Sequence, residues 1–320
     1  MFISFDRGYN IVCEFVEKKQ LQIANNETEH SKYNIRSIKN IGQPIIQLTN
    51  IDYVYPDGTH ALKSINLTIC EGEKIVFLGS NGAGKSTLFL ILNGLLKPLR
   101  GEFFYKNKRV GYSRSSLMEL RKNVGIVFQD PETQILSSNV FEEVSFGPMN
   151  LKLHEDIVRQ RVEDSLKKVC MFEHRKKPVH FLSYGQKKRV SIAGVLAMKP
   201  EVIIFDEPMS CLDPVNANNM IELFNELNDK GKTILISTHD IDFAYSWADK
   251  VVVMKDGEVI KQGGTQDVFK DRALLVFADL GVPLILEVYF ALCEKGIIKH
   301  YTPIPRSIQE LLALLSTRDI

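Results

Sequence analysis

The chain has 320 residues, of which 44% are hydrophobic and 25% are charged, and its formal net charge is +1. This length gives room for one large domain with additions at either end. The charge balance provides no basic field that would indicate nucleic acid as a partner. Five scattered cysteines without C-x-x-C spacing argue against a zinc site and a disulfide framework, and they suit a reducing cytosol. No apolar run approaches the roughly 18–20 residues that span a bilayer, so any membrane role is expected to depend on partners.

The first part of the chain, residues 1–44, is expected to form an N-terminal extension. Apolar residues alternate up to Val16, and a polar stretch rich in Asn, Glu and Lys follows, which we interpret as a mobile segment. From Ile45 to about Ile69, two strand-like runs flank the turn Pro56-Asp57-Gly58. Turn residues between two such runs favour an antiparallel hairpin.

The stretch Gly79–Thr87 matches the Walker A pattern G-x-x-x-x-G-K-[ST], a loop that wraps the phosphates of a nucleotide. Lys74–Leu78 before it reads as a buried strand, and Ser86–Leu92 reads as the apolar start of a helix. The alternative is a glycine-rich turn with a chance lysine, but strand, loop and helix together argue against it. The predicted nucleotide-binding residues of the loop are Gly79, Ser80, Asn81, Gly82, Ala83, Gly84, Lys85, Ser86 and Thr87. We expect Lys85 to reach the β- and γ-phosphates of a nucleoside triphosphate, and the hydroxyl of Ser86 to help hold Mg²⁺.

An alternation of strands and helices runs from Lys74 to about Lys270 and predicts an α/β fold. Apolar residues recur at helical spacing between Val158 and Val169, with charges on the opposite face, which predicts an amphipathic helix. Glu201–Phe205 and Thr233–Ser237 are short apolar runs of the kind found in buried parallel strands.

The run Val202–Glu207 is apolar and ends in two carboxylates, which is the Walker B form. A buried strand delivers such acids to the carboxyl edge of the sheet, where ligands bind in this class of fold. We expect Asp206 to hold Mg²⁺ and Glu207 to act as the general base that polarises the attacking water. Neighbouring side chains on a strand point to opposite faces, so both acids can serve one site only where the strand ends, which Pro208 favours. A strand that merely ends in two solvated acids is the alternative, and the preceding Walker A motif argues against it.

Beyond Asp271 the chain is predicted to be helical. Ser307-Ile308-Gln309-Glu310 has the form of a capping box, the signature of a helix start. One face of that helix then carries four apolar residues: Ile308, Leu311, Leu312 and Leu315. Core packing is the ordinary interpretation of this stripe, and a subunit interface is the sharper alternative.

Between the two phosphate motifs lies Leu182-Ser183-Tyr184-Gly185-Gln186, followed by Lys187-Lys188-Arg189-Val190. This run resembles L-S-G-G-Q, the signature of ATP-binding-cassette (ABC) ATPases, which other P-loop families lack. The other elements of the cassette follow in the expected order over about residues 45–270. They are Tyr55, similar to the aromatic residue that stacks on adenine, Gln129 of the Q-loop, Ser210–Pro214 of the D-loop and His239, the switch histidine.

The resemblance implies the fold of a P-loop NTPase of the ABC cassette type. Such a cassette has a central, mostly parallel sheet, an antiparallel β subdomain and an α-helical subdomain that carries the signature. On this basis residues 45–270 form the ATP-binding cassette, and residues 271–320 form a helical C-terminal extension. In the proteins that it resembles, that extension helps two ATPase subunits to pair.

The resemblance also implies a paired site. In this family two cassettes hold two ATP molecules between them, and each Walker A loop faces the signature of the other cassette. Ser183, Gly185 and Gln186 are therefore expected to bind the nucleotide of a partner, at the positive end of the signature helix.

Two further roles come from the resemblance. His239 is expected to hydrogen-bond the γ-phosphate and to help orient the water, and Gln129 to contact Mg²⁺ and to lie where a transmembrane partner docks. Alone, a histidine after a strand is most often a capping or surface residue, and a glutamine there is an ordinary polar strand end. Their places within the series of motifs favour the functional interpretation for both.

Two positions depart from the family pattern. Tyr184 replaces the first glycine of the signature, which puts in doubt any task that needs a bare backbone there, whereas the second glycine is kept as Gly185. Cys211 stands in the D-loop where Gly or Ser is usual. Both catalytic carboxylates and the phosphate lysine are present, so neither departure predicts an inactive site.

Within the superfamily, the runs Gln129–Gln134 and Phe141–Pro148 look most like energy-coupling-factor importers of the cobalt/nickel and vitamin kind. This implies an ATPase subunit that binds and hydrolyses ATP with Mg²⁺ to drive substrate uptake. Its expected partners are integral membrane subunits and a second ATPase subunit, either a copy or a related chain. The resemblance also implies peripheral attachment to the cytoplasmic side of the cell membrane. In such importers the membrane subunits, and not the ATPase, determine which substrate is transported.

Two other functions agree less well with the sequence. A soluble cassette ATPase that acts on DNA or ribosomes is disfavoured, because the balanced charge offers no basic stripe and we expect no nucleic acid partner. Only about a hundred residues separate Lys85 from Ser183, which leaves no room for the long coiled coil of chromosome-type members. A regulatory cassette that binds ATP without turnover is disfavoured by the presence of Glu207 and His239.

Overall fold

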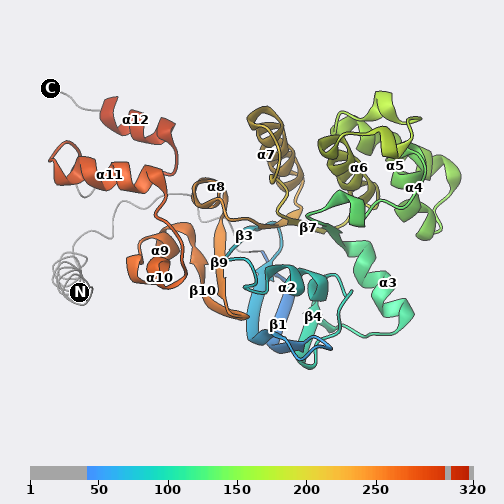
Figure 1. Ribbon diagram of the computed structural model, residues 1–320, viewed down its shortest axis with the longest axis horizontal. Helices are drawn as coiled ribbons and strands as arrows, with labels where there is room; N and C mark the ends of the chain where they lie inside the picture. Colours follow the sequence, from blue (N-terminus) through green and yellow to red (C-terminus); the bar gives the residue numbers. More distant parts are fainter. Residues whose placement is uncertain (1–41, 300–303, 317–320) are drawn as a thin grey trace, which may run out of the picture. The chain divides into compact units, whose positions relative to one another are not determined.

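The structure is a computed structural model that describes residues 42–299 and 304–316 (Figure 1). The interpretation of residues 1–44 as an N-terminal extension falls almost entirely outside these described residues. Within the described part of the chain, two sheets and a series of helices account for the architecture.

The first sheet is antiparallel and has the strand order β2-β1-β4-β5. Its strands are β1 (Pro44–Val54), β2 (His60–Cys70), β4 (Arg100–Tyr105) and β5 (Lys108–Arg109). Strands β1 and β2 pair through the register Leu48↔Leu67, and the backbone N–H of Gly58 donates to Tyr55 in the turn between them. The hairpin predicted around Pro56-Asp57-Gly58 is thus confirmed.

The second sheet has six strands in the order β10-β9-β3-β8-β7-β6. These are β3 (Lys74–Leu78), β6 (Val124–Val127), β7 (Val202–Asp206), β8 (Thr233–Ser237), β9 (Lys250–Lys255) and β10 (Glu258–Gly264). All neighbouring pairs are parallel except β9 with β10. Every residue of β7 and β8 is buried, as expected for parallel strands that are covered on both faces.

The strand order decides which loops meet. Strands β3, β8, β7 and β6 are successive neighbours that run in the same direction, so their carboxyl ends lie along one edge of the sheet. Residues 79–87, Glu207, His239 and Gln129 all follow the ends of these strands. The four motifs are therefore brought to one edge although they are distant in the sequence.

The helical group between β6 and β7 carries the signature. It consists of α4 (Val140–Asn150), α5 (Glu155–Lys168) and α6 (Tyr184–Ala197), with the short 3₁₀ helices η1 (Pro131–Thr133), η2 (Phe172–His174) and η3 (Val179–Phe181). Helix α5 confirms the amphipathic helix predicted here, because Val158, Val162 and Leu166 are buried. In Figure 1, α6 stands with α4 and α5 and apart from α2, the helix that follows the phosphate loop.

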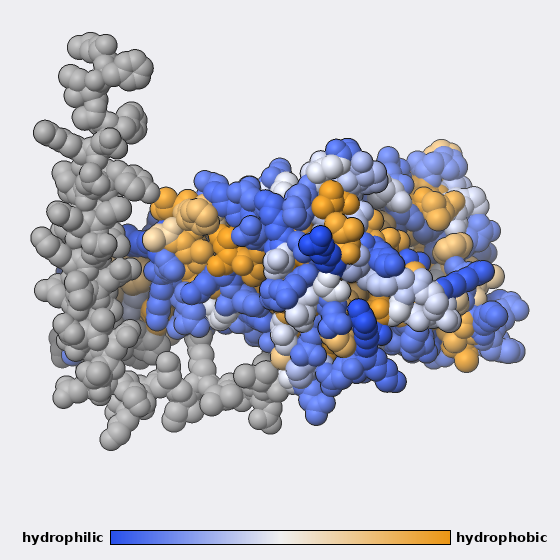
Figure 2. All heavy atoms as spheres, turned by 90° about the horizontal axis from the view of Figure 1, so that it is seen from below, coloured by the Kyte–Doolittle hydropathy of each residue, from blue (hydrophilic) through white to orange (hydrophobic). Residues whose placement is uncertain are grey.

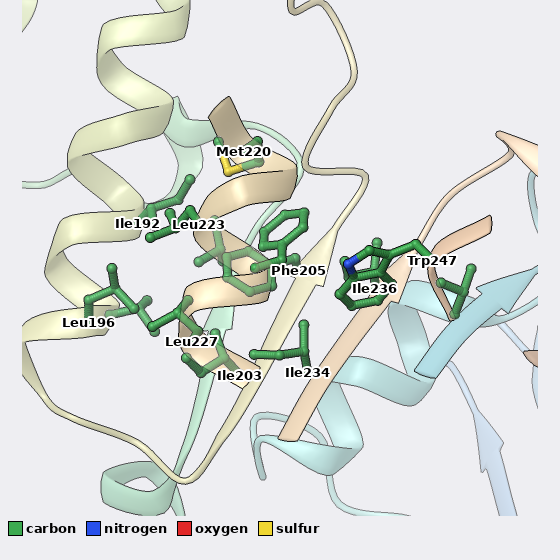
Figure 3. Close-up of a cluster of buried hydrophobic side chains, with 14 of the residues drawn as sticks. Ile192, Leu196, Ile203, Phe205, Met220, Leu223, Leu227, Ile234, Ile236 and Trp247 are labelled. Atoms are coloured by element: carbon green, nitrogen blue, oxygen red, sulfur yellow. The ribbon is translucent and has the colours of Figure 1, made fainter. Parts of the chain in front are cut away.

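The remaining helices of the main unit are α2 (Lys85–Leu92), α3 (Arg114–Asn123), α7 (Pro214–Asp229) and α8 (Ile241–Trp247). Figure 3 shows apolar side chains of α7 between those of α6 and those of strands β7 and β8. Ile192 of α6, Leu223 of α7 and Phe205 of β7 all belong to this buried cluster. The signature helix is thus joined to the central sheet by a continuous hydrophobic core.

Among the described residues, β10 is followed by four further helices: α9 (Thr265–Phe269), α10 (Arg272–Phe277), α11 (Leu284–Glu294) and α12 (Ile308–Ser316). The hydroxyl of Ser307 accepts the backbone N–H of Glu310, which confirms the first half of the predicted capping box, and the Glu310 carboxylate accepts the N–H of Arg306. Of the predicted apolar stripe, Leu311 is buried against α11, whereas Ile308 and Leu312 stay exposed.

Hydrophobic residues also remain on the surface. On the face drawn in Figure 2 they form separate orange patches among hydrophilic residues. Large exposed side chains occur in α10, α11 and α12. Within residues 42–299 and 304–316, no helix combines the length and the apolar character that crossing a membrane requires.

Candidate active site

The phosphate loop adopts a backbone that depends on its glycines. Gly79, Gly82 and Gly84 have φ values of 151°, 84° and 99°, a region that side chains other than glycine rarely enter. A Cβ atom at Gly79 would lie 2.2 Å from the Met254 carbonyl oxygen, and one at Gly82 would meet nothing within 4 Å. Packing against Met254 thus requires a glycine at position 79, whereas the space around Gly82 is open to a ligand.

Lys85 begins α2 and is 7% exposed. Its Nζ donates hydrogen bonds to the carbonyl oxygens of Gly79, at 2.6 Å, and Ser80, at 3.1 Å. Burial lowers the pKa of this ammonium, and the nearby carboxylates Glu207 and Asp206 oppose that effect. Lys85 is thus held against the loop that is predicted to enclose the phosphates of a nucleotide. Both acids are close enough to affect its pKa.

Asp206 and Glu207 occupy the end of β7. Asp206 is 7% exposed, and its carboxylate accepts a hydrogen bond from the hydroxyl of Ser237 in the neighbouring strand β8. The same hydroxyl oxygen accepts the backbone N–H of Glu207 at 2.9 Å. Glu207 has φ 45°, so the chain leaves the strand geometry at this residue. The turn predicted after the strand is therefore present, and it removes the strict alternation that would send the two acids to opposite faces.

Glu207 and His239 form a pair. The Nδ1 atom of His239 lies 3.2 Å from Oε2 of Glu207, whose side chain is 12% exposed, whereas that of His239 is 80% exposed. Burial raises the pKa of Glu207, and His239 and Lys85 counteract this. A carboxylate with a raised pKa is a better proton acceptor near neutral pH, which fits a general base.

Tyr55 lies beside the helix of the phosphate loop. Its hydroxyl is 3.0 Å from the Thr87 Oγ1 atom, and its ring meets Tyr53 edge to face at 5.0 Å between centroids. The half-buried ring is held next to the loop, where the family resemblance implies that it stacks on adenine.

The signature forms the amino end of α6. Ser183 caps the helix: its Oγ accepts the backbone N–H of Gln186 at 3.3 Å, and the Gln186 side chain accepts the Ser183 N–H at 3.1 Å. Ser183 is exposed, and a Cβ atom at Gly185 would meet only a Leu212 methyl group at 3.8 Å. Gln186 therefore has a capping role that the sequence did not predict, and the helix tip presents an open, rigid surface.

The two departures from the family pattern have definite positions. The hydroxyl of Tyr184 donates to the Gln129 carbonyl oxygen at 3.2 Å, so the signature touches the Q-loop of its own chain. Cys211 has φ 61° and is exposed, which explains why a glycine suits this position. Gln129 itself is exposed.

Comparison with known proteins decides the family. A family model described as ABC transporter matches residues 62–210. The chain is 49% identical over 251 residues to the energy-coupling factor transporter ATP-binding protein EcfA of Methanocaldococcus jannaschii, covering 78% of this chain and 90% of the relative. This chain belongs to the family of ABC transporter ATP-binding proteins.

Other similarities agree with this assignment. The ABC protein described here is 44% identical over 273 residues to EcfA2 of Methanospirillum hungatei, covering 85% of this chain and 68% of the relative. Its structure resembles that of cbiO1 from Clostridium perfringens, described as part of the ABC transporter complex cbiONQ, with a TM-score of 0.66 and 46% identity. That match covers 78% of this chain and 99% of cbiO1. The ABC cassette fold and the ATPase subunit of energy-coupling-factor type, predicted from the sequence, are confirmed.

The ABC ATPase also offers a donor set that fits Mg²⁺. The residues predicted to hold the metal could supply a carboxylate (Asp206), a hydroxyl (the exposed Ser86) and an amide oxygen (Gln129), all of which are hard ligands. In the described part of the chain, no group of three or more His, Cys, Asp and Glu side chains could hold a metal by itself. Mg²⁺ is commonly bound by one or two carboxylates together with substrate phosphates, so the residues present fit a metal that arrives with ATP.

The sequence did not predict a role in the site for two residues of this ABC ATPase, Ser237 and Lys188. Ser237 connects Asp206 and Glu207 by hydrogen bonds, and Lys188 contacts the backbone of Glu207 from α6. A sequence signal exists for Lys188, because it shares a helix face with Ile192, one turn further on, and thus interrupts an apolar stripe. For Ser237, the only signal is a polar residue at the end of an apolar strand.

Proposed function

We propose that this chain powers uptake through a membrane transporter by closing with a second cassette around ATP and Mg²⁺. The phosphate loop would supply one wall of each site and the signature of the partner the other. The exposed, capped tip of α6 supports this, since it stands apart from α2 of its own chain. The structure also resembles the ATP-binding cassette MJ0796, a dimer bound to ADP and Pi, at 32% identity and a TM-score of 0.62. That match covers 69% of this chain and 98% of that chain.

In the proposed complex, residues 79–87 enclose the phosphates with backbone N–H groups, and Lys85 neutralises their charge. Tyr55 packs on the adenine ring. Ser86, Gln129 and Asp206 would hold Mg²⁺, which would supply positive charge against the charge that develops on the phosphates. Ser183, Gly185 and Gln186 complete the site of the partner chain.

Hydrolysis then follows from the geometry of the acids. Glu207 accepts a proton from water as the water oxygen bonds to the γ-phosphorus, and the bond from that phosphorus to the leaving oxygen of ADP breaks. His239, 3.2 Å from Glu207, orients the carboxylate and reaches the γ-phosphate from its exposed position. The products are ADP, inorganic phosphate and a protonated Glu207 that returns its proton to solvent.

The observation that carries this proposal is the pair formed by Glu207, which follows Asp206 at the end of β7, and His239, which follows the neighbouring strand β8. Its test is Glu207→Gln, which keeps the shape of the side chain but removes the base. We expect phosphate release to fall by at least about 100-fold, the usual scale of a general base, while ATP binding persists. Turnover close to wild type would remove Glu207 from this role.

The proposed transport partners are inferred from related proteins. We propose that the cassette, residues 45–270, docks on integral membrane subunits from the cytoplasmic side of the cell membrane. Residues 271–320 would help two ATPase subunits to pair, and exposed Phe277, Leu284 and Ile308 supply apolar surface for this. A cobalt, nickel or vitamin importer is the proposed class, because Gln129–Gln134 and Phe141–Pro148 look most like importers of that kind. Co-purification of membrane subunits with the tagged chain, followed by uptake assays, tests it.

A further inference from the structure

Lys188 is an unusual residue of the signature helix. Of the charged side chains that the structure describes in residues 42–299 and 304–316, it alone is completely enclosed, at 0% exposure. An ammonium group removed from water is costly unless hydrogen bonds replace the lost hydration. We therefore expect the Lys188 ammonium to have hydrogen-bond partners inside the protein.

The partners of Lys188 lie in the loop after β7. Its Nζ donates to the carbonyl oxygen of Glu207 at 2.8 Å and to the Oγ atom of Ser210 at 3.2 Å. The Ser210 hydroxyl donates to the same Glu207 carbonyl at 2.8 Å. One backbone oxygen of the catalytic glutamate thus receives two donors, one of them the charged and buried Lys188 and the other the partly buried Ser210.

The other side of Glu207 is also held, because its N–H donates to Ser237 of β8. Between these contacts Glu207 has φ 45°, a left-handed conformation that is unfavourable for a residue with a side chain. Such a conformation persists only when the surroundings enforce it. Here Ser237 fixes the nitrogen and Lys188, with Ser210, fixes the oxygen.

We propose that Lys188 is a positioning residue for ATP hydrolysis. It holds the Glu207 backbone in the left-handed turn that directs the carboxylate to the site, and it connects the signature helix to the catalytic base of the same chain. Ser183 and Lys188 lie in the same rigid helix, so a shift of α6 on contact with the nucleotide of the partner moves the Glu207 carbonyl. This inference rests on the role of Glu207 proposed above.

The charges around Lys188 allow it to donate. Burial lowers its pKa to about 8, and the groups that face it, Cys211, Glu207, Asp206 and Asp130, counteract the effect. Because a pKa of about 8 lies above neutral pH, the ammonium form predominates at pH 7.

The test is Lys188→Met in the full chain, because methionine keeps much of the aliphatic volume and removes both hydrogen bonds. We expect kcat for ATP to fall by about tenfold or more, with the Kd for ATP within about twofold of wild type. Lys232→Met is the matched control, since this partly buried lysine lies at the opposite end of β8, and its kcat is expected to be unchanged.

A double-mutant cycle distinguishes positioning from general packing. Ser210→Ala removes the second donor to the same carbonyl, so we expect a loss in kcat of about threefold. Because Lys188 also donates to Ser210, the loss in the double variant should be smaller than the product of the two single losses. A kcat of Lys188→Met within about twofold of wild type, an equal loss of ATP affinity, or additive effects would each overturn the proposal. If Lys188→Met does not fold, a wild-type kcat for Ser210→Ala overturns it. Failure of the Glu207→Gln test would instead refute the role of the base itself.

Discussion

The carboxyl edge of the parallel sheet and the tip of the signature helix differ in how complete they are. At the edge, Lys85 and Asp206 are each 7% exposed, and Ser237 and loop carbonyls hold them in place. At the tip, Ser183 is exposed and engages Gln186 of its own helix. The edge is thus assembled within one chain, whereas the tip is rigid but open. The comparison indicates that ATP affinity belongs to the first region and that turnover depends on the second.

The largest effect that this comparison predicts is at Lys85. Lys85→Ala removes the cation from the preformed region, and charge-assisted bonds to phosphate are the strong ones. We expect the Kd of the isolated chain for ATP to rise by at least about tenfold, as measured by equilibrium dialysis or fluorescent nucleotide titration. Lys230→Ala is the control, because that exposed lysine pairs only with Glu226 of its own helix in the structure described. An unchanged dissociation constant would place ATP affinity elsewhere.

Ser183→Ala probes the open region in the same way. If the helix tip serves a partner, the variant should bind ATP like wild type as an isolated chain. Turnover of the paired form should fall by about tenfold, the lower end of the effect of losing one hydrogen bond to a charged group. Phosphate release and nucleotide titration on the same preparation measure the two quantities. Ser246→Ala, at an exposed serine of α8, should change neither. A weaker Kd in the isolated Ser183 variant would contradict the division between the two regions.

The two regions also differ in how far the sequence predicted them. The phosphate loop, the strand before it and the acids after β7 were predicted by their residues, because each is local: a glycine pattern, an apolar run and a turn. The contact of Ser237 with Asp206 could not be predicted in this way, because it requires β8 to lie next to β7. Strand order is a property of the whole sheet. The burial of Lys188 depends likewise on the packing of α6 against the loop after β7.

A third prediction concerns pH within the assembled region. Burial raises the pKa of Glu207, and a base acts only when deprotonated, so kcat/KM should be fully present above that pKa and lost as the pH falls through it. His239 lowers the pKa of Glu207, so His239→Ala should raise it and move the acidic limb of the profile to higher pH. The profile measures this independently of the absolute rate. His154→Ala, at an exposed histidine before α5, should leave the limb in place, and a limb that moves to lower pH in the His239 variant would contradict the assignment.

The smallest effect is expected at Tyr184, where the two regions touch within one chain. Its hydroxyl makes a single hydrogen bond of 3.2 Å to the Gln129 carbonyl, and the side chain is 37% exposed, so water can replace the bond. Tyr184→Phe should therefore reduce turnover by less than about threefold, since an exposed neutral hydrogen bond contributes little. Tyr184→Gly, which restores the glycine usual in the family, removes the ring as well and separates packing from hydrogen bonding. A loss in Tyr184→Phe as large as that in Ser183→Ala would mean that the Q-loop, and not only the partner nucleotide, is controlled from the helix tip.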